Sequence, residues 1–464
     1  MDAIYDVVKF AKNTKYEDIP EEVIRGARMV LKDAIAVAVA GTGAEGVAGA
    51  RKVVTEWAGK GESSTLVFGD KLPAQHAAFL NSVLTHARDY DEFQPDAIVH
   101  TEISVIPVIM AIAEALGNID GKEILRTIVV TEDIFIRLGY AIKAQSTENG
   151  WIYSSVVGYL TSALAASMLM GLDEEQMVNA MGIAYAQMAG NHQAARDTTL
   201  TKRMQPGFAA RSGIFAAYLA REGLTGAHNV LEGKFGFFNV YIHGKYDIEE
   251  LKKDLGKKFL INDLSFKPNP ICGPCLSPTS TMEKLVAENN IRPEEILSID
   301  VGTNEHGVIA CAQPKEVKFN PQKVVEAQFS IPFAVTKVAS KGTIGLRDMT
   351  EEGLNDPVMR SLLDKVNVYT DEELEKNFGR GISPAKITVQ TNRGDFTDCI
   401  FQKGHPTNPF TDADMERKFK DCFSFGIYEP KEGAADQILS TIDHLEDLKD
   451  FTELIRMVND SFVK

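Results

Sequence analysis

The stretch Glu21–Val39 reads EEVIRGARMVLKDAIAVAV, and it shows which kind of structure the first part of the chain adopts. Its apolar residues recur at intervals of three and four, as on one face of an α-helix. The same spacing returns in six later stretches before residue 262, where alternation of β-branched residues is scarce. These stretches are Ala74–Leu84, Ile103–Leu116, Gly121–Ala144, Tyr153–Met170, Asp173–Ala189 and Gly207–Glu222. The sequence therefore predicts a large all-helical domain over residues 1–262.

The pattern changes after Pro268, where the alternation typical of strands is mixed with helical spacing. The predicted strands are Ile296–Thr303, Ala327–Ile331, Ala385–Thr391 and Asp395–Phe401, and the predicted helices are Thr279–Glu288 and Ile331–Val338. This mixture predicts a smaller α+β domain over residues 263–402. Helical spacing returns from Asp412, so residues 403–464 are expected to rejoin the helical domain. The predicted fold class is therefore mainly α.

Composition excludes several classes of function. The chain has 464 residues and a formal net charge of −16, which repels nucleic acid and anionic membranes at long range. The N-terminal residues MDAIYDVVKFAK carry acidic groups where a secretory signal requires a basic start, so a cytoplasmic location is expected. Five cysteines in so long a chain do not form a disulfide framework. The uncharged stretch Asn149–Leu172 holds many small and hydroxyl-bearing residues, which favours a buried helix over a membrane span.

A first group of candidate functional residues lies between His86 and Pro107. The segment holds two histidines, His86 and His100, and five carboxylates, directly ahead of the apolar stretch Ile103–Leu116. Such a density of titratable groups beside a core helix indicates a site that handles protons. The alternative is a solvated acidic loop.

A second group lies between Asn191 and Gly213. It contains four cations, Arg196, Lys202, Arg203 and Arg211, against the single acid Asp197. A basic cluster ahead of a helix start is suited to binding carboxylates, because both the cations and the helix N-terminus attract anions. Lys202 is the candidate base within it. The alternative is an ordinary solvated loop with scattered cations.

The sequence Cys272-Gly273-Pro274-Cys275 has the spacing of a redox-active cysteine pair. Thioredoxin-type chemistry requires a strand directly before the first cysteine, whereas here Pro268 and Pro270 precede it. A proline-stiffened turn is the favoured interpretation. No two further zinc ligands stand at fitting spacing nearby, and no glycine-rich phosphate loop occurs in the required context.

Several motifs, taken together and in order, resemble the MmgE/PrpD family over nearly the whole chain. They are His86-x-x-Asp89-x-Asp91-Glu92, His100, Pro107, Glu132, Arg137, Gly150-Trp151, Gly171-Leu172-Asp173-x-x-Gln176, Thr201-Lys202-Arg203-Met204-x-x-Gly207-x-Ala209-Ala210-x-Ser212-Gly213, Leu224-Thr225-Gly226, Phe266-Lys267-Pro268-x-Pro270-x-Cys272, Phe329-Ser330, Asn408-Pro409 and Lys418-Phe419. The family includes 2-methylcitrate dehydratase, cis-aconitate decarboxylase and iminodisuccinate epimerase.

The resemblance implies a helical domain formed from both ends of the chain, a smaller α+β lid domain and a homodimer. It also implies an enzyme that uses no metal or organic cofactor and acts on small anionic di- or tricarboxylates. Carried over by position, the family's functional aspartate, histidine and lysines fall on Asp89, His100, Lys202 and Lys267.

Four positions depart from the family pattern. The dehydratase and decarboxylase branches carry a histidine where this chain has Ile152, next to Tyr153. Gln205 replaces the histidine usual after the basic lysine, Cys275-Leu276 replaces a Thr-His pair, and Phe333 replaces an aromatic that is often tyrosine. These losses remove acid, base and anion-binding groups, so a retuned pocket is expected.

The family's common step removes a proton or a carboxylate next to a carboxylate-bearing carbon. We expect Lys202 and Tyr153 to form the proton-transfer pair, with Arg203 and Lys267 holding substrate carboxylates. His100 is expected to supply or orient a second proton, and Asp89 to hold a neighbouring cation or histidine.

Three functions stay open on the sequence. The first is a lyase, a hydratase or dehydratase, and the second is a dicarboxylate epimerase or isomerase, or a decarboxylase. The third is a non-catalytic protein that binds carboxylates.

Overall fold

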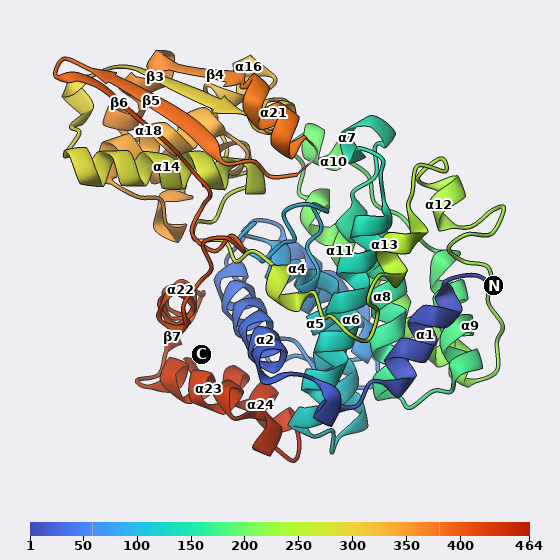
Figure 1. Ribbon diagram of the computed structural model, residues 1–464. Helices are drawn as coiled ribbons and strands as arrows, with labels where there is room; N and C mark the ends of the chain where they lie inside the picture. The colour runs from blue at the N-terminus through green and yellow to red at the C-terminus, as the bar shows by residue number, and fades with distance from the viewer. Residues whose placement is uncertain (58, 380) are drawn as a thin grey trace. The chain divides into compact units, whose positions relative to one another are not determined.

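The computed structural model describes residues 1–57, 59–379 and 381–464 and contains two compact units. The helical unit comprises Met1–Leu264 and Asp412–Lys464, and the α+β unit comprises Ser265–Thr411 (Figure 1). The prediction of a mainly α fold with a smaller α+β part is confirmed. The sequence pattern predicts the second boundary after residue 402. In the structure the α+β unit continues to Thr411, and Gln402 and Gly404 form hydrogen bonds with Ser265 and Phe266 of the same unit.

The helical unit is built from long helices and a few short ones. Its helices are α1 (Ile4–Asn13), α2 (Glu21–Gly41), α3 (Val47–Trp57), α4 (Ala74–His86), α5 (Glu102–Leu116), α6 (Gly121–Ala141), α7 (Ser146–Asn149), α8 (Tyr153–Leu169), α9 (Glu174–Tyr185), α10 (Gln193–Arg196), α11 (Thr201–Arg221), α12 (Phe237–Val240), α13 (Ile248–Lys252), α22 (Asp412–Ser424), α23 (Ala434–Asp443) and α24 (Thr452–Asp460). Two short strand pairs accompany them, β1 (Ser63–Ser64) with β2 (Lys71–Leu72) and β7 (Glu429–Pro430) with β8 (Phe462–Val463).

Helix α8 is the core of this unit, because all 17 of its residues are buried. Glycines let its neighbours approach closely. A Cβ added at Gly213 of α11 would lie 2.4 Å from the Ser162 side chain of α8, and one at Gly207 would lie 2.8 Å from the Phe79 carbonyl of α4. Helix α11, whose first turn carries Lys202 and Arg203, is therefore packed closely against both α4 and α8.

Helix α8 makes up most of the uncharged stretch Asn149–Leu172, and it is buried as expected. Outside residues 58 and 380, no helix combines the length and the apolar character needed to cross a membrane.

The C-terminal segment packs on the helical unit through α22, which lies beside α2 (Figure 1). The ammonium of Lys418 lies 2.6 Å from the Asp33 carboxylate, and both side chains are buried. Lys418 also donates to the Tyr90 carbonyl at 2.7 Å. A buried cation on α22 therefore neutralises a buried acid on α2.

The α+β unit contains a four-stranded sheet in the order β4-β3-β5-β6. The strands are β3 (Ile296–Thr303), β4 (Val366–Thr370), β5 (Ala385–Thr391) and β6 (Gly394–Ile400), with β3 and β4 parallel and the other pairs antiparallel. Its helices are α14 (Gly273–Asn289), α15 (Glu305–Cys311), α16 (Lys315–Lys318), α17 (Val324–Gln328), α18 (Ile331–Lys341), α19 (Glu351–Leu354), α20 (Pro357–Leu362) and α21 (Glu372–Phe378). Helices α14 and α18 pack on each other along one face of the sheet (Figure 1).

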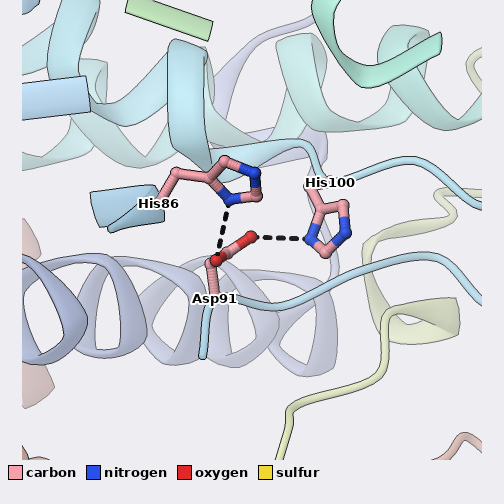
Figure 2. A group of neighbouring side chains, drawn as sticks. All are labelled: His86, Asp91 and His100. Atoms are coloured by element: carbon pink, nitrogen blue, oxygen red, sulfur yellow. Dashed lines mark hydrogen bonds and ion pairs between the residues drawn. The ribbon is translucent and has the colours of Figure 1, made fainter. Parts of the chain in front are cut away.

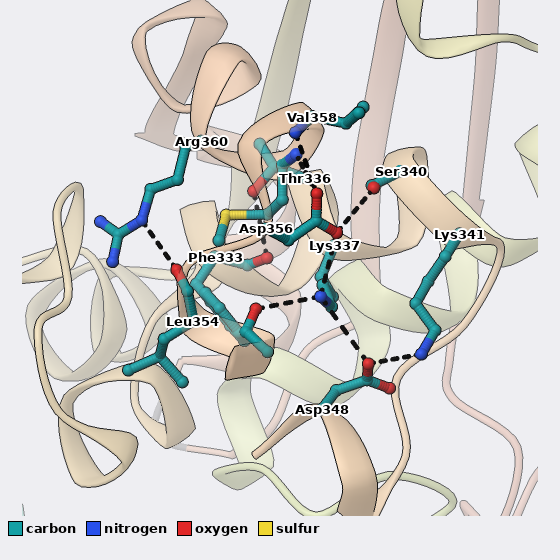
Figure 3. Close-up of polar contacts among 12 residues, drawn as sticks. Phe333, Thr336, Lys337, Ser340, Lys341, Asp348, Leu354, Asp356, Val358 and Arg360 are labelled. Atoms are coloured by element: carbon teal, nitrogen blue, oxygen red, sulfur yellow. Dashed lines mark hydrogen bonds and ion pairs between the residues drawn. The ribbon is translucent and has the colours of Figure 1, made fainter. Parts of the chain in front are cut away.

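A buried lysine ties α18 to the segment that follows it (Figure 3). Lys337 Nζ lies 3.0 Å from both the Gly353 carbonyl and Asp356, and 3.7 Å from Asp348. Lys341 binds Asp348 as well. Because each of these groups has a partner within the unit, we assign this network to stability.

Three sequence predictions are wrong at the level of single elements. Residues Ala327–Ile331 form no strand. Ala327 lies within α17, and the Ser330 side chain caps the next helix, α18, by accepting a hydrogen bond from the Phe333 amide. Helices α11 and α14 begin six residues before the predicted starts, at Thr201 and Gly273. Pro206 and Pro278 suggest helix boundaries, yet a proline in the second turn costs one backbone hydrogen bond and does not end the helix.

Candidate active site

The loop between α4 and α5, residues 87–101, is largely buried. Of the five carboxylates that the sequence places between His86 and Pro107, only Asp96 is exposed. The alternative of a solvated acidic loop is therefore wrong. Asp89 and Ile98 adopt φ angles of 53° and 55°, a left-handed conformation that side chains other than glycine rarely adopt. Such backbone strain concentrates at functional sites.

Asp91 bridges two histidines at the centre of this loop (Figure 2). Its Oδ1 lies 3.0 Å from His86 Nδ1, and its Oδ2 lies 2.6 Å from His100 Nδ1. Burial acts to raise the pKa of Asp91, but the two imidazoles outweigh it and hold that pKa well below its usual range. Burial lowers the pKa of His86 to about 4, so His86 is neutral near pH 7.

The same three side chains are the group best placed to hold a metal ion among the residues that the structure describes, with ligand atoms within 4.8 Å of one another. Zinc ligands at about 2.0–2.2 Å from a tetrahedral ion would lie about 3.4 Å apart. Both observed separations are shorter: His86 Nδ1 forms a hydrogen bond with Asp91 Oδ1 at 3.0 Å, and His100 Nδ1 lies in ion-pair contact with Asp91 Oδ2 at 2.6 Å. The geometry fits protons between these groups rather than a metal.

A second carboxylate holds Lys202. The Asp89 Oδ2 atom lies 3.3 Å from Lys202 Nζ, and the two side chains are 5% and 18% exposed. Lys202 and Arg203 lie in the first turn of α11 rather than in a loop. Asp89 and Lys202, predicted separately, are thus brought together.

Arg203 is buried and donates to the Glu45 carbonyl at 3.0 Å. Burial lowers the pKa of Arg203, and the nearby Asp89 opposes that shift. Arg88 donates to the Ala40 carbonyl at 3.0 Å, and burial together with Arg203 lowers its pKa to about 10. Arg88 therefore anchors the end of α2 and Arg203 anchors the segment that follows α2, and a substrate-binding role for Arg203 stays a prediction.

Tyr153 is the first residue of α8, and its hydroxyl group has two partners. It donates to the Ala144 carbonyl and accepts from the Asn149 amide, each at 2.9 Å. These bonds hold the segment before α8, so the proton-transfer role predicted for Tyr153 stays a prediction. The next residue, Ser154, accepts from the His100 backbone amide at 2.9 Å, which places the start of α8 beside His100.

The remaining candidates lie elsewhere. Lys267 is fully buried in the α+β unit, and its predicted contact with substrate stays a prediction. Gln205 is buried on α11 and donates to the Asn191 carbonyl at 3.0 Å. Cys272 and Cys275 begin α14 and form no disulfide, so the predicted turn is a helix start.

Asp91 and His86 are part of the site, but the sequence alone does not predict a functional role for either residue. Asp91 is a member of the family motif, but its position between two histidines depends on the path of the loop. The available signal is two histidines on either side of an Asp-x-Asp-Glu run.

Glu92 links the loop that carries His100 to the start of α5 through hydrogen bonds. Its Oε1 atom accepts from the Thr101 amide, the Thr101 hydroxyl and the Glu102 amide, each at 2.8 Å, at the start of α5. Its backbone carbonyl lies 2.8 Å from His100 Nδ1. Burial raises the pKa of Glu92 from 4.5 to about 7, so Glu92 is partly protonated near neutral pH. Burial also raises the pKa values of Glu102 and Glu132 well above their usual range.

Glu92→Gln is expected to remove a pH dependence of stability. Between pH 4.5 and 7 the folded wild type keeps a proton that the unfolded chain releases, so its free energy of unfolding falls as the pH rises. Glutamine keeps an oxygen acceptor but cannot titrate. Between pH 5.5 and 8 the wild type should therefore lose about 1–2 kcal/mol relative to the variant, measured by urea denaturation. Asp96→Asn, in the exposed part of the loop, is the control and should run parallel to the wild type, and a parallel Glu92→Gln curve would contradict the assignment.

Comparisons with known proteins extend over nearly the whole chain. The family model of the MmgE/PrpD N-terminal domain matches residues 6–249, and that of the MmgE/PrpD C-terminal domain matches residues 270–444. The chain is 25% identical to a cis-aconitate decarboxylase-like protein of Aspergillus oryzae, over 98% of this chain and 96% of that protein. It is 25% identical to the cis-aconitate decarboxylase of Aspergillus terreus, with 97% and 95% covered. It is 27% identical to the human cis-aconitate decarboxylase, with 85% and 82% covered.

Proposed function

The chain belongs to the MmgE/PrpD family, whose members act on small carboxylates, and on that premise we propose that it is a hydro-lyase of a small di- or tricarboxylate. The reaction would take place at the site formed by Lys202, Asp89, His100 and Asp91. The proposed partner is a small anionic substrate. A homodimer and a cytoplasmic location stay predictions from the sequence.

One observation carries the choice of elimination. The site holds two separate groups that can transfer protons, Lys202 and His100, and each is held by its own carboxylate. Elimination of water requires a base for the hydrogen next to the carboxylate and an acid for the departing hydroxyl group. Two independently oriented groups meet that requirement.

Decarboxylation is the second candidate, and the names of the relatives favour it. Loss of carbon dioxide leaves a carbanion that needs one proton, so one of the two groups would suffice. Epimerisation needs one group on each face of the substrate carbon. The departures at Ile152 and Gln205 favour a pocket that differs from those of the dehydratase and decarboxylase branches.

A substrate panel run in heavy water separates these reactions. We expect the purified protein, without added metal, to form a conjugated acid from a hydroxy-di- or tricarboxylate, detected by ultraviolet absorbance and mass spectrometry. Carbon dioxide release would replace this proposal with decarboxylation. Deuterium at the α-carbon without net elimination would replace it with epimerisation. Binding without turnover on the whole panel would identify a carboxylate-binding protein.

A further inference from the structure

We propose that Asp91 is the positioning residue of this site, holding His86 and His100 in a single tautomer with both Nε2 lone pairs directed away from it. The catalytic consequence rests on the proposed function, in which His100 transfers a proton. The tautomer itself does not depend on which reaction is catalysed.

The hydrogen bonds define the tautomer. An ionised carboxylate only accepts hydrogen bonds, so the ring nitrogen that faces it must carry a hydrogen. His86 Nδ1 faces Oδ1 at 3.0 Å, and His100 Nδ1 faces Oδ2 at 2.6 Å. In a neutral imidazole the hydrogen on Nδ1 leaves the lone pair on Nε2.

A second acceptor gives the same assignment for His100. Its Nδ1 also lies 2.8 Å from the backbone carbonyl of Glu92, which cannot donate. The ring nitrogen therefore lies against two oxygen atoms that can only accept, so it carries the hydrogen. His100 Nε2 is thus left to accept or return a proton.

The surroundings keep both rings in place. The Asp91 side chain is 0% exposed, and the two rings meet edge to face with centroids 5.3 Å apart. The Ser154 hydroxyl holds the backbone of His100. The charge of Lys202 is felt at His86, where it helps to lower the pKa. His86 is therefore within electrostatic range of both groups to which we assign proton transfer.

Replacing the carboxylate with an amide tests this arrangement. The side chain of Asp91→Asn has one oxygen and one NH2 group, so one of the two histidines would face a donor. His100 keeps the Glu92 carbonyl as an acceptor, which allows the NH2 group to face it only as a competing donor, whereas His86 facing the NH2 group would have to move its hydrogen to Nε2. Labelling the nine histidines with 15N and recording their ring spectra reports the tautomers directly. His86→Gln and His100→Gln assign the two signals.

We expect the wild type to show two histidines with hydrogen on Nδ1, and Asp91→Asn to convert at least one of them. In the active enzyme kcat should fall by up to about 10⁴-fold, the loss seen when a catalytic histidine loses its orienting carboxylate, while KM changes little. Asp96→Asn, an exposed carboxylate in the same loop, should leave both readouts unchanged. If Asp91→Asn does not fold, His86→Gln still serves, because it should keep the His100 signal in the Nδ1–H form.

Three results would overturn the proposal: unchanged tautomers in Asp91→Asn, unchanged kcat despite a changed tautomer, or stoichiometric binding of added zinc that shifts both histidine signals. If the wild type turns over nothing on the carboxylate panel, the proposed function fails while the spectra still decide the tautomers. The two failures are therefore distinguishable.

Discussion

Lys202→Met is expected to lower kcat/KM by about 10²- to 10⁴-fold, the usual contribution of a group that transfers a proton in the transition state. Methionine keeps much of the volume of the side chain but has no ammonium group. Because Lys202 lies in the first turn of α11 rather than in the core, we expect the circular dichroism spectrum to stay that of the wild type. Full activity would refute the central assignment of the site.

A double variant separates the chemistry of Lys202 from its pairing. Lys202→Met leaves the buried carboxylate of Asp89 without its lysine, which should lower the free energy of unfolding by about 1–3 kcal/mol. Adding Asp89→Asn removes that charge and should restore most of the stability. Activity should stay low in the double variant. Recovery of activity together with stability would mean that Lys202 acts only through the fold.

Lys418→Met is expected to lower the free energy of unfolding by about 3–5 kcal/mol, as when one partner of a buried ion pair is removed. Asp33 is 0% exposed and would keep a buried carboxylate without its cation. The Tyr90 carbonyl and ring would lose the ammonium as well. The loss should appear in urea denaturation followed by tryptophan fluorescence, because Trp57 and Trp151 both lie in the helical unit.

The chain offers a matched control for this prediction. Lys420 lies two residues further along α22 and pairs with Glu416 and Asp436 at the surface. Lys420→Met should cost less than about 1 kcal/mol, because exposed ion pairs contribute little. Lys418→Met with Asp33→Asn should recover most of the lost stability. Equal effects of Lys418→Met and Lys420→Met would contradict a buried pair.

The sequence predicts the fold well where periodicity alone determines the element. Helix α2 and strands β3 and β5 lie where the spacing of their apolar residues places them. The strand predicted at Ala327–Ile331 fails, because five residues of apolar pattern cannot distinguish a strand from the junction of two helices. Only the Ser330 cap, a local hydrogen bond, determines that the chain turns helical there.

The site is predicted less completely, for reasons of distance along the chain. Asp89, His100 and Lys202 follow from the charge clusters and the family resemblance. Their pairing does not, because 113 residues separate Lys202 from Asp89. The burial of the acidic loop depends on α2, α5 and α6 packing around it, and no spacing in residues 86–107 reveals that. The sequence alone therefore leaves a solvated acidic loop open as the alternative to a proton-handling site, and the structure shows a buried network.

The order in which the chain is synthesised gives the Lys418–Asp33 pair a further meaning. Asp33 leaves the ribosome early, whereas Lys418 follows the whole of the α+β unit. Until Lys418 is synthesised, residues 1–264 contain Asp33 without the lysine that pairs with it in the folded protein, so the interior of the helical unit is incomplete. The α+β unit, which is continuous in sequence, can fold first as a separate body. The segment Asp412–Lys464 therefore completes the helical unit, and a nascent or truncated chain that lacks α22 would be exposed to chaperones and proteases.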